Sequence, residues 1–480
     1  MKTITEPSRQ LNVRSEVDVL VVGGGPSGII AAEAAAGKGL KVMILESRGF
    51  LGGNLTIGLP ILSFLNCNGK QNIKGLPQKF IDRLRKDGNA SDHKPCKLHM
   101  SLTIINSEAA KDVALDIMEE KGVEVLMYTF VADTITEGRK VKGVIIESKA
   151  GREAILAKTI IDCTGDGDVA YRAGVAMSKG DAQGGMQPPT LMYNMRGVDV
   201  NKLRDAVVNH HDEFDMDTMP AHQFAQGMFI TVGLRNQIKK AQAAGIKIPV
   251  ARTILITGLN KDEIWVNMTR VNGVDSTLPE SYTHGEIEAR KQIKEINRYL
   301  KQFVPGFENA YMDKVTPFMG IRESRVMQGR YILTAEDILS SRRFDHVVTV
   351  ASYPVDIHHA TDDDCTMMFT KDDYDIPFEC LLPKEYDNLL VAGRCSSMNH
   401  EAMAATRVMS TCMALGEAAG RAARIALSTG VEPANIDIKT LQKELRDTGA
   451  YLGDLYHENT VYILHTVPVG IAIYQWEEDC

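Results

Sequence analysis

The short segment "GIRESR", residues 320–325, carries side chains that could bind and activate an anion. It brings Arg322, Glu323 and Arg325 within one turn of backbone. Two guanidinium groups can hold an anionic substrate through paired hydrogen bonds and stabilise charge that develops during hydride transfer. Either arginine could equally pair with Glu323 or another carboxylate in a purely structural network. The segment therefore gives Arg322 and Arg325 as catalytic candidates, with the structural alternative left open.

A second segment, "YPVDIHH" at residues 353–359, could move protons. His358 and His359 follow Asp356 closely, and histidine is the side chain whose charge changes near neutral pH. A single histidine is more often structural than catalytic, so the spacing to Asp356 is what favours a role in a substrate site. We expect His358 or His359 to act as the acid or base, and His400, beside a Gly-Arg pair, is a further candidate.

These groups need an element that brings a reactant to them, and the stretch "VDVLVVGGGPSGIIAAEAAAGKGLKVMILES", residues 17–47, predicts one. An apolar run typical of a buried parallel strand leads into Gly23, Gly25 and Gly28, at the spacing that permits a tight turn, backbone approach to a pyrophosphate and close helix packing. A helix from Pro26 and a second strand ending at Glu46 complete a dinucleotide-binding unit, in which the acidic side chain accepts hydrogen bonds from ribose hydroxyls.

Elements downstream of Glu46 favour FAD over NAD as the nucleotide. "SRGFLGGNLT" (47–56) replaces the βα unit with which a nicotinamide dehydrogenase normally continues. A helix over 106–122, with Ser107 as its N-cap, is followed by a meander of short antiparallel strands that ends in "TIIDCTGDGD" (159–168). A last strand, Gly-Arg turn and small-residue helix lie in 387–427 and predict a helix N-terminus aimed at the flavin. An NAD-binding protein without flavin remains the alternative.

The chain resembles the FAD-dependent oxidoreductase family, with a glutathione-reductase-like fold, and is similar to the flavin subunit of heterodisulfide reductase and distantly to fumarate reductase. Beyond the glycine loop, the resemblance rests on "GGNLT", "DCTGDGD", "GIRESR", "YPVDIHH", "IPFECLLPKEYDNLLVAGRC" and "RVMSTCMALGEAAG". It implies FAD as cofactor. The residues expected at FAD are Gly23, Gly25, Pro26, Ser27, Gly28, Glu46, Ser47, Arg48, Gly53, Asn54, Leu55, Thr56, Val131, Thr164, Gly165, Asp166, Gly393, Arg394, Arg407, Val408 and Met409.

Two departures from such relatives shape the expected chemistry. The eight cysteines are scattered, with no C-x-x-C pair and no Cys/His cluster at metal-ligand spacing, so we expect no metal and no iron–sulfur relay. No second G-x-G-x-x-G follows a strand, so no dedicated NADPH domain is predicted. The reactant is therefore expected to reach the flavin face directly.

Length and composition set the organisation. A chain of 480 residues exceeds the ~250–300 residues of one core. We expect an α/β fold: a discontinuous FAD-binding Rossmann domain of the glutathione-reductase type in 1–190 and 376–480, with a mixed α+β substrate domain inserted over 191–375. The net charge of -8 argues against nucleic-acid binding. The weakly charged run 461–476 is too short to span a bilayer, and we interpret it as buried or subunit-facing.

These observations predict a cytoplasmic FAD-dependent oxidoreductase that passes a hydride between flavin N5 and a small polar or anionic organic substrate. Its expected partner is that small molecule, with no nucleic acid and no membrane span, and a homo-oligomer is compatible with the sequence. Two alternatives stay open. One is a fumarate-reductase-like double-bond reductase with an arginine proton donor, and the other is a flavin-bearing electron-transfer subunit of a larger complex.

Overall fold

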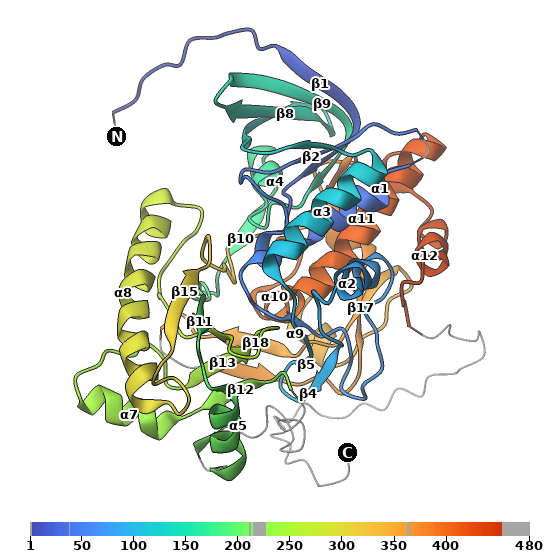
Figure 1. Cartoon of the computed structure of the whole chain (residues 1–480). Coiled ribbons are helices and arrows are strands. Elements are labelled where there is room, and N and C mark those ends of the chain that lie inside the picture. Colours follow the sequence, from blue (N-terminus) through green and yellow to red (C-terminus); the bar gives the residue numbers. More distant parts are fainter. Residues whose placement is uncertain (1, 38, 211–212, 215–226, 362–364, 454–480) are drawn as a thin grey trace.

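A computed structural model describes residues 2–37, 39–210, 213–214, 227–361 and 365–453. The weakly charged run 461–476 lies outside these residues. Among the residues described, no helix is both long and apolar enough to cross a membrane. The expected α/β class is confirmed by a mixed sheet of parallel and antiparallel strands that helices cover (Figure 1).

The main sheet is built on five parallel strands. In spatial order they are β6 (Glu124–Leu126), β2 (Val42–Leu45), β1 (Val13–Val22), β9 (Gly151–Asp162) and β21 (Leu389–Val391). Ile160 of β9 pairs with Leu20 of β1 on one side and with Leu389 of β21 on the other. The last strand thus returns, across most of the chain, to the strand that precedes the "DCTGDGD" turn.

The predicted meander is confirmed, and it shares β9 with the parallel strands. β7 (Phe130–Glu137), β8 (Lys140–Ser148) and the first half of β9 pair antiparallel. Gly138 and Gly151, at the two turns, have φ angles of 56° and 98°, values that glycine adopts without steric cost. The second half of β9 is free of β8 and pairs with β21 instead.

Helices pack closely on one face of this sheet. They are α1 (Pro26–Ala35), α3 (Ser107–Lys121) and α11 (Met409–Thr429), and Figure 1 shows them stacked. A Cβ at Gly416 of α11 would lie 2.1 Å from the Ser27 carbonyl oxygen of α1, and one at Gly420 would lie 2.2 Å from the Ala31 carbonyl oxygen. Glycine is therefore needed at both positions for the two helices to make this contact. The N-cap of α3 is Asn106 rather than the predicted Ser107, because the Asn106 side chain accepts hydrogen bonds from the amides of residues 108 and 109.

A second core belongs to an inserted unit with its own sheet, in the order β12-β13-β14-β11-β15. Its elements are β11 (Tyr193–Arg196), α5 (Val200–Asn209), β12 (Ile230–Gly233), α7 (Arg235–Ala243), β13 (Thr253–Thr257), β14 (Ile264–Val266), α8 (Pro279–Phe303) and β15 (Tyr311–Val315). Apart from Cys96 and Leu102, its buried apolar residues run from Leu191 to Met319, whereas most of those from Val326 to Leu382 belong to the core beneath α1 and α11. The domain boundaries at 190 and 375 stay predictions.

The remaining elements lie outside these two large sheets and the helices already named. In chain order they are η1 (Gly53–Thr56), β3 (Ile61–Leu62), α2 (Leu76–Lys86), β4 (Lys94–Cys96), β5 (Met100–Thr103), α4 (Asp168–Arg172), β10 (Met177–Lys179), β16 (Arg325–Met327), α9 (Ala335–Leu339), β17 (Val347–Ala351), β18 (Val355–His358), β19 (Cys365–Met368), β20 (Tyr374–Pro377), η4 (Phe378–Leu381), α10 (His400–Thr406), η5 (Pro433–Asn435) and α12 (Ile438–Asp447). The small-residue helix, expected to begin near 406–409, is α11, which begins at Met409; the short helix α10 that precedes it was not predicted.

Candidate active site

The glycine loop between β1 and α1 forms a cradle whose glycines differ in what they are needed for. Gly23 has a φ of 99°, and a Cβ there would lie 2.4 Å from the Cys163 carbonyl oxygen. A Cβ at Gly28 would lie 1.8 Å from the Gly23 oxygen. Gly25 is different, because its φ is −78° and a Cβ there would meet nothing within 4 Å. The fold requires glycine at the first two positions, and only an occupant of the open space requires it at Gly25.

The acidic residue at the end of β2 closes this loop. The Glu46 carboxylate accepts hydrogen bonds from the Gly24 amide and from the Arg48 amide, both at 2.8 Å, and from the Ser47 hydroxyl at 3.0 Å. Glu46 also lines the space beside Gly25. Its carboxylate thus lies where a ribose hydroxyl could reach it, as expected from the sequence pattern.

We call the space over the glycine loop the cradle cavity; it encloses about 900 Å³, including open solvent. The predicted cofactor residues that line it are Gly23, Gly25, Pro26, Ser27, Glu46, Arg48, Gly53, Asn54, Thr164, Asp166, Gly393, Arg394, Arg407 and Met409. They come from four segments far apart in the sequence. The inserted unit that contains the second core, which we call the cap, contributes Ser276, Tyr282 and Phe318. These three could not be identified from the sequence because no motif marks them.

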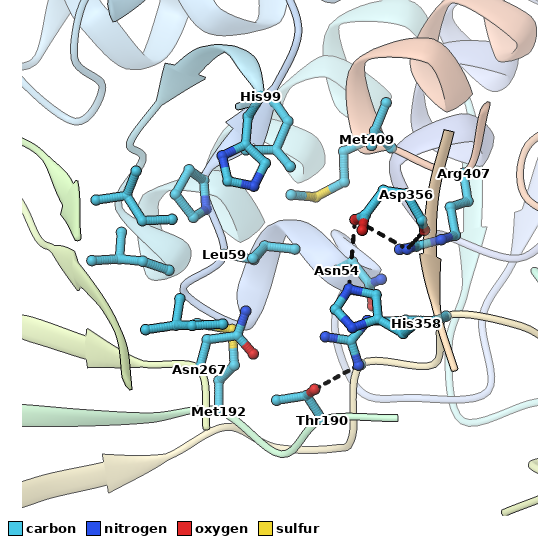
Figure 2. Close-up of a pocket in the computed structure, with 18 of the residues that line it drawn as sticks. Asn54, Leu59, His99, Thr190, Met192, Asn267, Asp356, His358, Arg407 and Met409 are labelled. Atoms are coloured by element: carbon cyan, nitrogen blue, oxygen red, sulfur yellow. Dashed lines mark hydrogen bonds and ion pairs between the residues drawn. The ribbon is translucent and has the colours of Figure 1, made fainter. Parts of the chain in front are cut away.

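A second space, the inner cavity, encloses about 1100 Å³, including open solvent. It adjoins the cradle cavity, since Asn54, Ile321, Arg394, Arg407 and Met409 line both. Three further predicted residues line the inner cavity and not the cradle cavity: Arg322, His358 and Val408. Figure 2 shows Asp356, His358 and Arg407 gathered on one side of it.

The other predicted residues line neither cavity. Of the cofactor set, these are Gly28, Ser47, Leu55, Thr56, Val131 and Gly165. Thr56 donates to the Gly53 carbonyl at 2.8 Å and so closes the turn of η1. A Cβ at Gly165 would lie 3.0 Å from a nitrogen of Arg394, and φ there is 81°. Val131 lies in β7, with a buried side chain. Their proposed part in cofactor binding would be through backbone atoms or through support of the cradle.

His359 and His400 also lie outside both cavities. His359 is half-buried, and its Nε2 is 2.7 Å from the Thr366 hydroxyl oxygen. The Nδ1 of His400 is 2.7 Å from the Glu323 carboxylate. Burial acts to lower the pKa of His400, but the hydrogen bond and charge of Glu323, together with the charges of Glu401 and Asp181, raise that pKa overall. Glu323 therefore has a structural partner in His400 rather than in either arginine of its own segment.

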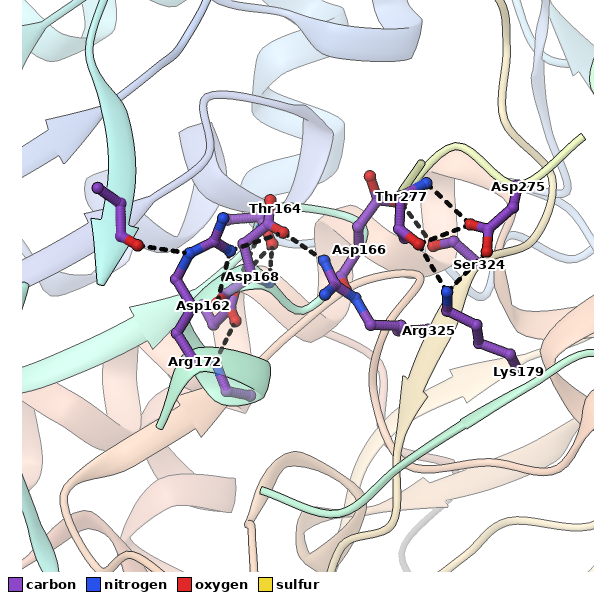
Figure 3. Close-up of polar contacts among 12 residues, drawn as sticks. Asp162, Thr164, Asp166, Asp168, Arg172, Lys179, Asp275, Thr277, Ser324 and Arg325 are labelled. Carbon is purple, nitrogen blue, oxygen red and sulfur yellow. Dashed lines mark hydrogen bonds and ion pairs between the residues drawn. The ribbon is translucent and has the colours of Figure 1, made fainter. Parts of the chain in front are cut away.

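Arg325 lines neither cavity and is held in a polar network, which Figure 3 shows. Its Nε donates to the Asp166 carbonyl at 2.8 Å, its guanidinium pairs with Asp168, and it lies 4.1 Å above the Tyr171 ring. Asp166, in turn, accepts from Arg394 at 2.6 Å. The geometry matches the structural alternative for Arg325, which ties the "TGDGD" turn to the "GIRESR" segment.

Arg322, by contrast, lies at the wall of the inner cavity. One of its nitrogens donates to the Pro188 carbonyl and, at 2.7 Å, to the Thr190 hydroxyl. Both acceptors are neutral. Desolvation by the surrounding protein and the nearby Arg407 cation lower the pKa of Arg322 to about 9, so the side chain still carries its charge at neutral pH. A cation held this way is poorly compensated and would gain from an anionic ligand.

Asp356 and His358 form a pair beside this cation. Their side chains approach to 3.5 Å, and Asp356 also accepts from the Tyr353 hydroxyl at 3.1 Å. Burial lowers the pKa of His358 to about 3, with a further contribution from the Arg322 charge. The pKa of Asp356 is lowered in spite of burial, because His358 and Arg407 favour its ionised form. At neutral pH the pair is a carboxylate and a neutral imidazole.

One polar residue near this pair, His99, was missed from the sequence, and a second, Gln187, was indicated by it. His99 lines the inner cavity, with its ring stacked on Tyr353 at 6.2 Å between centroids. It lies in "KLHMSLT", which has no pattern that would single it out. Gln187 accepts hydrogen bonds from the His358 amide at 3.1 Å and from Arg407 at 3.4 Å. Gln187 and Thr190 belong to "GGMQPPTLMYNM" (184–195), which the sequence indicates as the crossing into the inserted domain, with both side chains able to touch the flavin ring.

The buried histidines predict a loss of stability in acid. Burial lowers the pKa of His93 and His99 to about 4 and that of His358 to about 3. The unfolded chain takes up these protons near pH ~6.5 while the folded chain does not, so stability is present above that pH and falls as pH drops. Asp373, whose pKa burial raises to about 6, and His400 act in the opposite direction. The free energy of unfolding should fall by about 2–3 kcal/mol per pH unit near pH ~5.

Urea unfolding at a series of pH values measures this slope. His93 lies between Gln78 and Thr103 and lines neither cavity, so His93→Gln should flatten the slope by about 1.4 kcal/mol per pH unit. The control is His284→Gln, at an exposed position of α8. A slope that His93→Gln leaves unchanged would contradict the assignment of a buried neutral imidazole.

The cradle fits FAD on observations of this chain alone. The open space at Gly25 lies at the start of α1, whose first amide groups have no partner within the helix and favour an anion. Two guanidinium nitrogens that border the cavities, Nη1 of Arg394 and Nε of Arg407, are buried and have no hydrogen-bond partner among the described residues. The cradle can therefore hold the diphosphate, with polar donors left over for the rest of the cofactor.

These features define a class of protein: a flavoprotein with a glycine cradle on a parallel sheet and a cap over a second cavity. The chain belongs to the FAD dependent oxidoreductase family, which it matches over residues 18–445. It is accordingly an enzyme with FAD as cofactor, and this confirms the resemblance that the motifs predicted.

Relatives of known name match only part of the chain. A thiamine thiazole synthase from Methanococcus vannielii is 32% identical over 170 residues, which cover 31% of this chain and 56% of that protein. A digeranylgeranylglycerophospholipid reductase 1 from Methanococcoides burtonii is 28% identical over 167 residues, covering 32% and 38%. The chain thus spans about half, or less, of the curated relatives it matches. A geranylgeranyl bacteriochlorophyll reductase-like structure from Thermoplasma acidophilum is 14% identical, covers 90% of this chain and 84% of that one, and has a TM-score of 0.48.

Proposed function

We propose that this FAD-dependent oxidoreductase transfers a hydride between N5 of FAD and a small polar or anionic organic substrate in the inner cavity. The observation that carries the proposal is Arg322, a cation at the cavity wall whose acceptors, Pro188 and Thr190, are neutral. FAD, when bound, supplies the centre that accepts or gives the electron pair. The residues that would hold it are those that line the cradle cavity.

The arginines give the inner cavity a positive lining. Arg252, Arg322, Arg394 and Arg407 line it, and among the described lining residues Asp356 is the single acidic one. Arg394 is paired with Asp166, and Arg407 lies 3.6 Å from Asp356. Arg252 donates to the Cys365 sulfur. Arg322, whose charge acts on His358, is therefore the guanidinium best placed to bind a substrate anion beside that histidine. Its planar fork can hold a carboxylate through two parallel hydrogen bonds and fix its orientation.

His358 handles the proton in this proposal. Its imidazole is neutral at neutral pH and can accept a proton, and Asp356 orients it and stabilises the charged form. Arg322 and burial keep the pKa of His358 low while the cavity holds no anion. An anionic substrate paired with Arg322 offsets that charge, so substrate binding raises the basicity of His358 at the moment it is needed.

A double-bond reductase is the second candidate, and one observation favours it. The lowered pKa of Arg322, about 9, makes this guanidinium a better proton donor than an ordinary arginine. In that reading Arg322 gives a proton to one carbon of an α,β-unsaturated acid while the hydride goes to the other. Reoxidation of the reduced protein by unsaturated but not saturated acids would identify this reaction.

We expect His358→Asn to slow anaerobic reduction of the protein by its organic substrate by about 10²–10⁴-fold, the range of general acid–base contributions. The purified protein should be yellow, and its absorption spectrum before and after acid precipitation reports whether flavin is present and covalently attached. Stopped-flow reduction with a panel of hydroxy acids, amino acids and saturated acids then finds the substrate. Reduction by a protein partner but by no small molecule would favour the electron-transfer subunit instead.

His359→Asn is the matched control, since its ring lies next to the Thr366 hydroxyl and lines neither cavity. We expect it to leave the reduction rate within about twofold of the unsubstituted protein, because it removes no group that faces the reactants. Equal losses at both positions would count against His358 as the proton-handling residue.

A further inference from the structure

The inner cavity has a second wall that differs chemically from the arginine side. On the cap sheet, Ile230 and Val232 of β12 and Ile254 and Ile256 of β13 line it. Ile230 pairs with Ile256 and Val232 with Ile254 across the two strands. Because alternate residues of a strand share one face, these four side chains form one continuous apolar patch.

Leucines from the FAD-binding unit extend this wall. Leu62 of β3 and Leu98, between β4 and β5, line the same cavity and pack against the cap core. Leu62, Leu98 and Ile254 are half-buried rather than buried, so part of their surface faces the cavity. Leu59 and Met192 also line the cavity, and Figure 2 shows Met192 apart from the cluster of Asp356, His358 and Arg407. Exposed apolar surface inside a concave site gains free energy when an apolar ligand covers it.

We propose that the substrate is an aliphatic chain that ends in an anionic group, with the anion at Arg322 and the chain on the isoleucine patch. The inference rests on the proposed function, because it assigns the substrate class of the same cavity. A small, wholly polar acid would leave the isoleucine patch exposed to water, and a neutral lipid would leave Arg322 without an anion. A molecule with an aliphatic chain and an anionic group would contact both walls of the cavity.

The test is a chain-length series of n-alkanoates, titrated calorimetrically into the FAD-loaded protein below the concentrations at which they form micelles. From butanoate to octanoate, each added methylene should tighten binding by about threefold to fourfold, the gain for a buried CH₂. Octanamide, which has the chain but no charge, should bind at least about 30-fold more weakly than octanoate. A flat series, or equal binding of octanamide, would overturn the inference.

Ile254→Glu tests the position of the chain. A carboxylate on the patch should weaken the binding of octanoate at least tenfold and that of butanoate only slightly, and it should leave the flavin spectrum unchanged. Ile287→Glu, at an exposed position of α8 that lines neither cavity, is the matched control and should leave both affinities unchanged. If Ile254→Glu does not fold, Ile254→Ala serves instead, with a several-fold loss confined to the longer acids. Equal weakening of short and long acids would remove the chain from this patch.

Failure of this inference and failure of the proposed function give different results. A flat series in a protein whose flavin is reduced by a short hydroxy acid overturns the aliphatic chain and leaves the oxidoreductase assignment in place. A steep series in a protein whose flavin no organic acid reduces or reoxidises overturns the proposed reaction and leaves the ligand class in place.

Discussion

Gly25→Val is expected to give folded protein whose affinity for FAD is lower by about 10- to 100-fold, which is the ~1–3 kcal/mol of an overpacked contact. Gly25 has a φ of −78°, which any residue adopts, and its Cβ would meet no atom within 4 Å. Every other described glycine with open space at its Cβ has a positive φ. Glycine at this one position is therefore explained only by a group that fills the cradle.

The contrast with Gly28→Val makes the test specific. At Gly28 a Cβ would lie 1.8 Å from the Gly23 oxygen, so that substitution should lower the yield of folded protein rather than the flavin content alone. Gly25→Ala should give an intermediate loss of FAD. The measurements are the ratio of flavin to protein absorbance and the thermal unfolding midpoint of each variant. Full occupancy in Gly25→Val would refute the position of the phosphates.

Much of the fold followed from the sequence because its signals are local. The strand and glycine pattern of 17–28, the turns at Gly138 and Gly151 and the stop at Gly122 each depend on backbone conformations that few residues permit. The meander and the dinucleotide unit were accordingly predicted. The short helix α10 was not, because Arg407 and Val408, where it gives way to α11, are neither glycine nor proline and mark no boundary in the sequence.

The site could be predicted only in part, because it depends on contacts between distant segments. The motifs indicated Arg322 and Arg325 alike, and only the structure separates them: Asp168 lies against Arg325, while neutral oxygens lie against Arg322. His99 and the isoleucines of β12 and β13 carry no motif at all. They read as ordinary core residues, and their place at the cavity is set by how the cap packs on the FAD-binding unit.

Arg322→Met should abolish the anion preference of the inner cavity and leave the flavin in place. Loss of a guanidinium that pairs with a bound carboxylate costs about 2–5 kcal/mol, or about 30-fold or more in the dissociation constant of hexanoate. Turnover with the organic substrate should be lost with it. Arg322→Lys keeps the charge but not the planar fork, so we expect an intermediate affinity. Calorimetric titration of hexanoate into each FAD-loaded variant measures the difference, and unchanged affinity and turnover would remove Arg322 from the active site.

The stability of the same variants separates a binding residue from a structural one. Arg322 has neutral hydrogen-bond acceptors, so Arg322→Met should leave the free energy of unfolding within about 1 kcal/mol of its original value. Arg325 is buried and paired with Asp168, so Arg325→Met should lower it by about 3 kcal/mol. Hexanoate affinity should change in the opposite way: Arg322→Met should lose it, and the folded fraction of Arg325→Met should keep it. If both variants lost stability and affinity together, the two arginines would act as one network, and the anion site would have to lie elsewhere in the cavity.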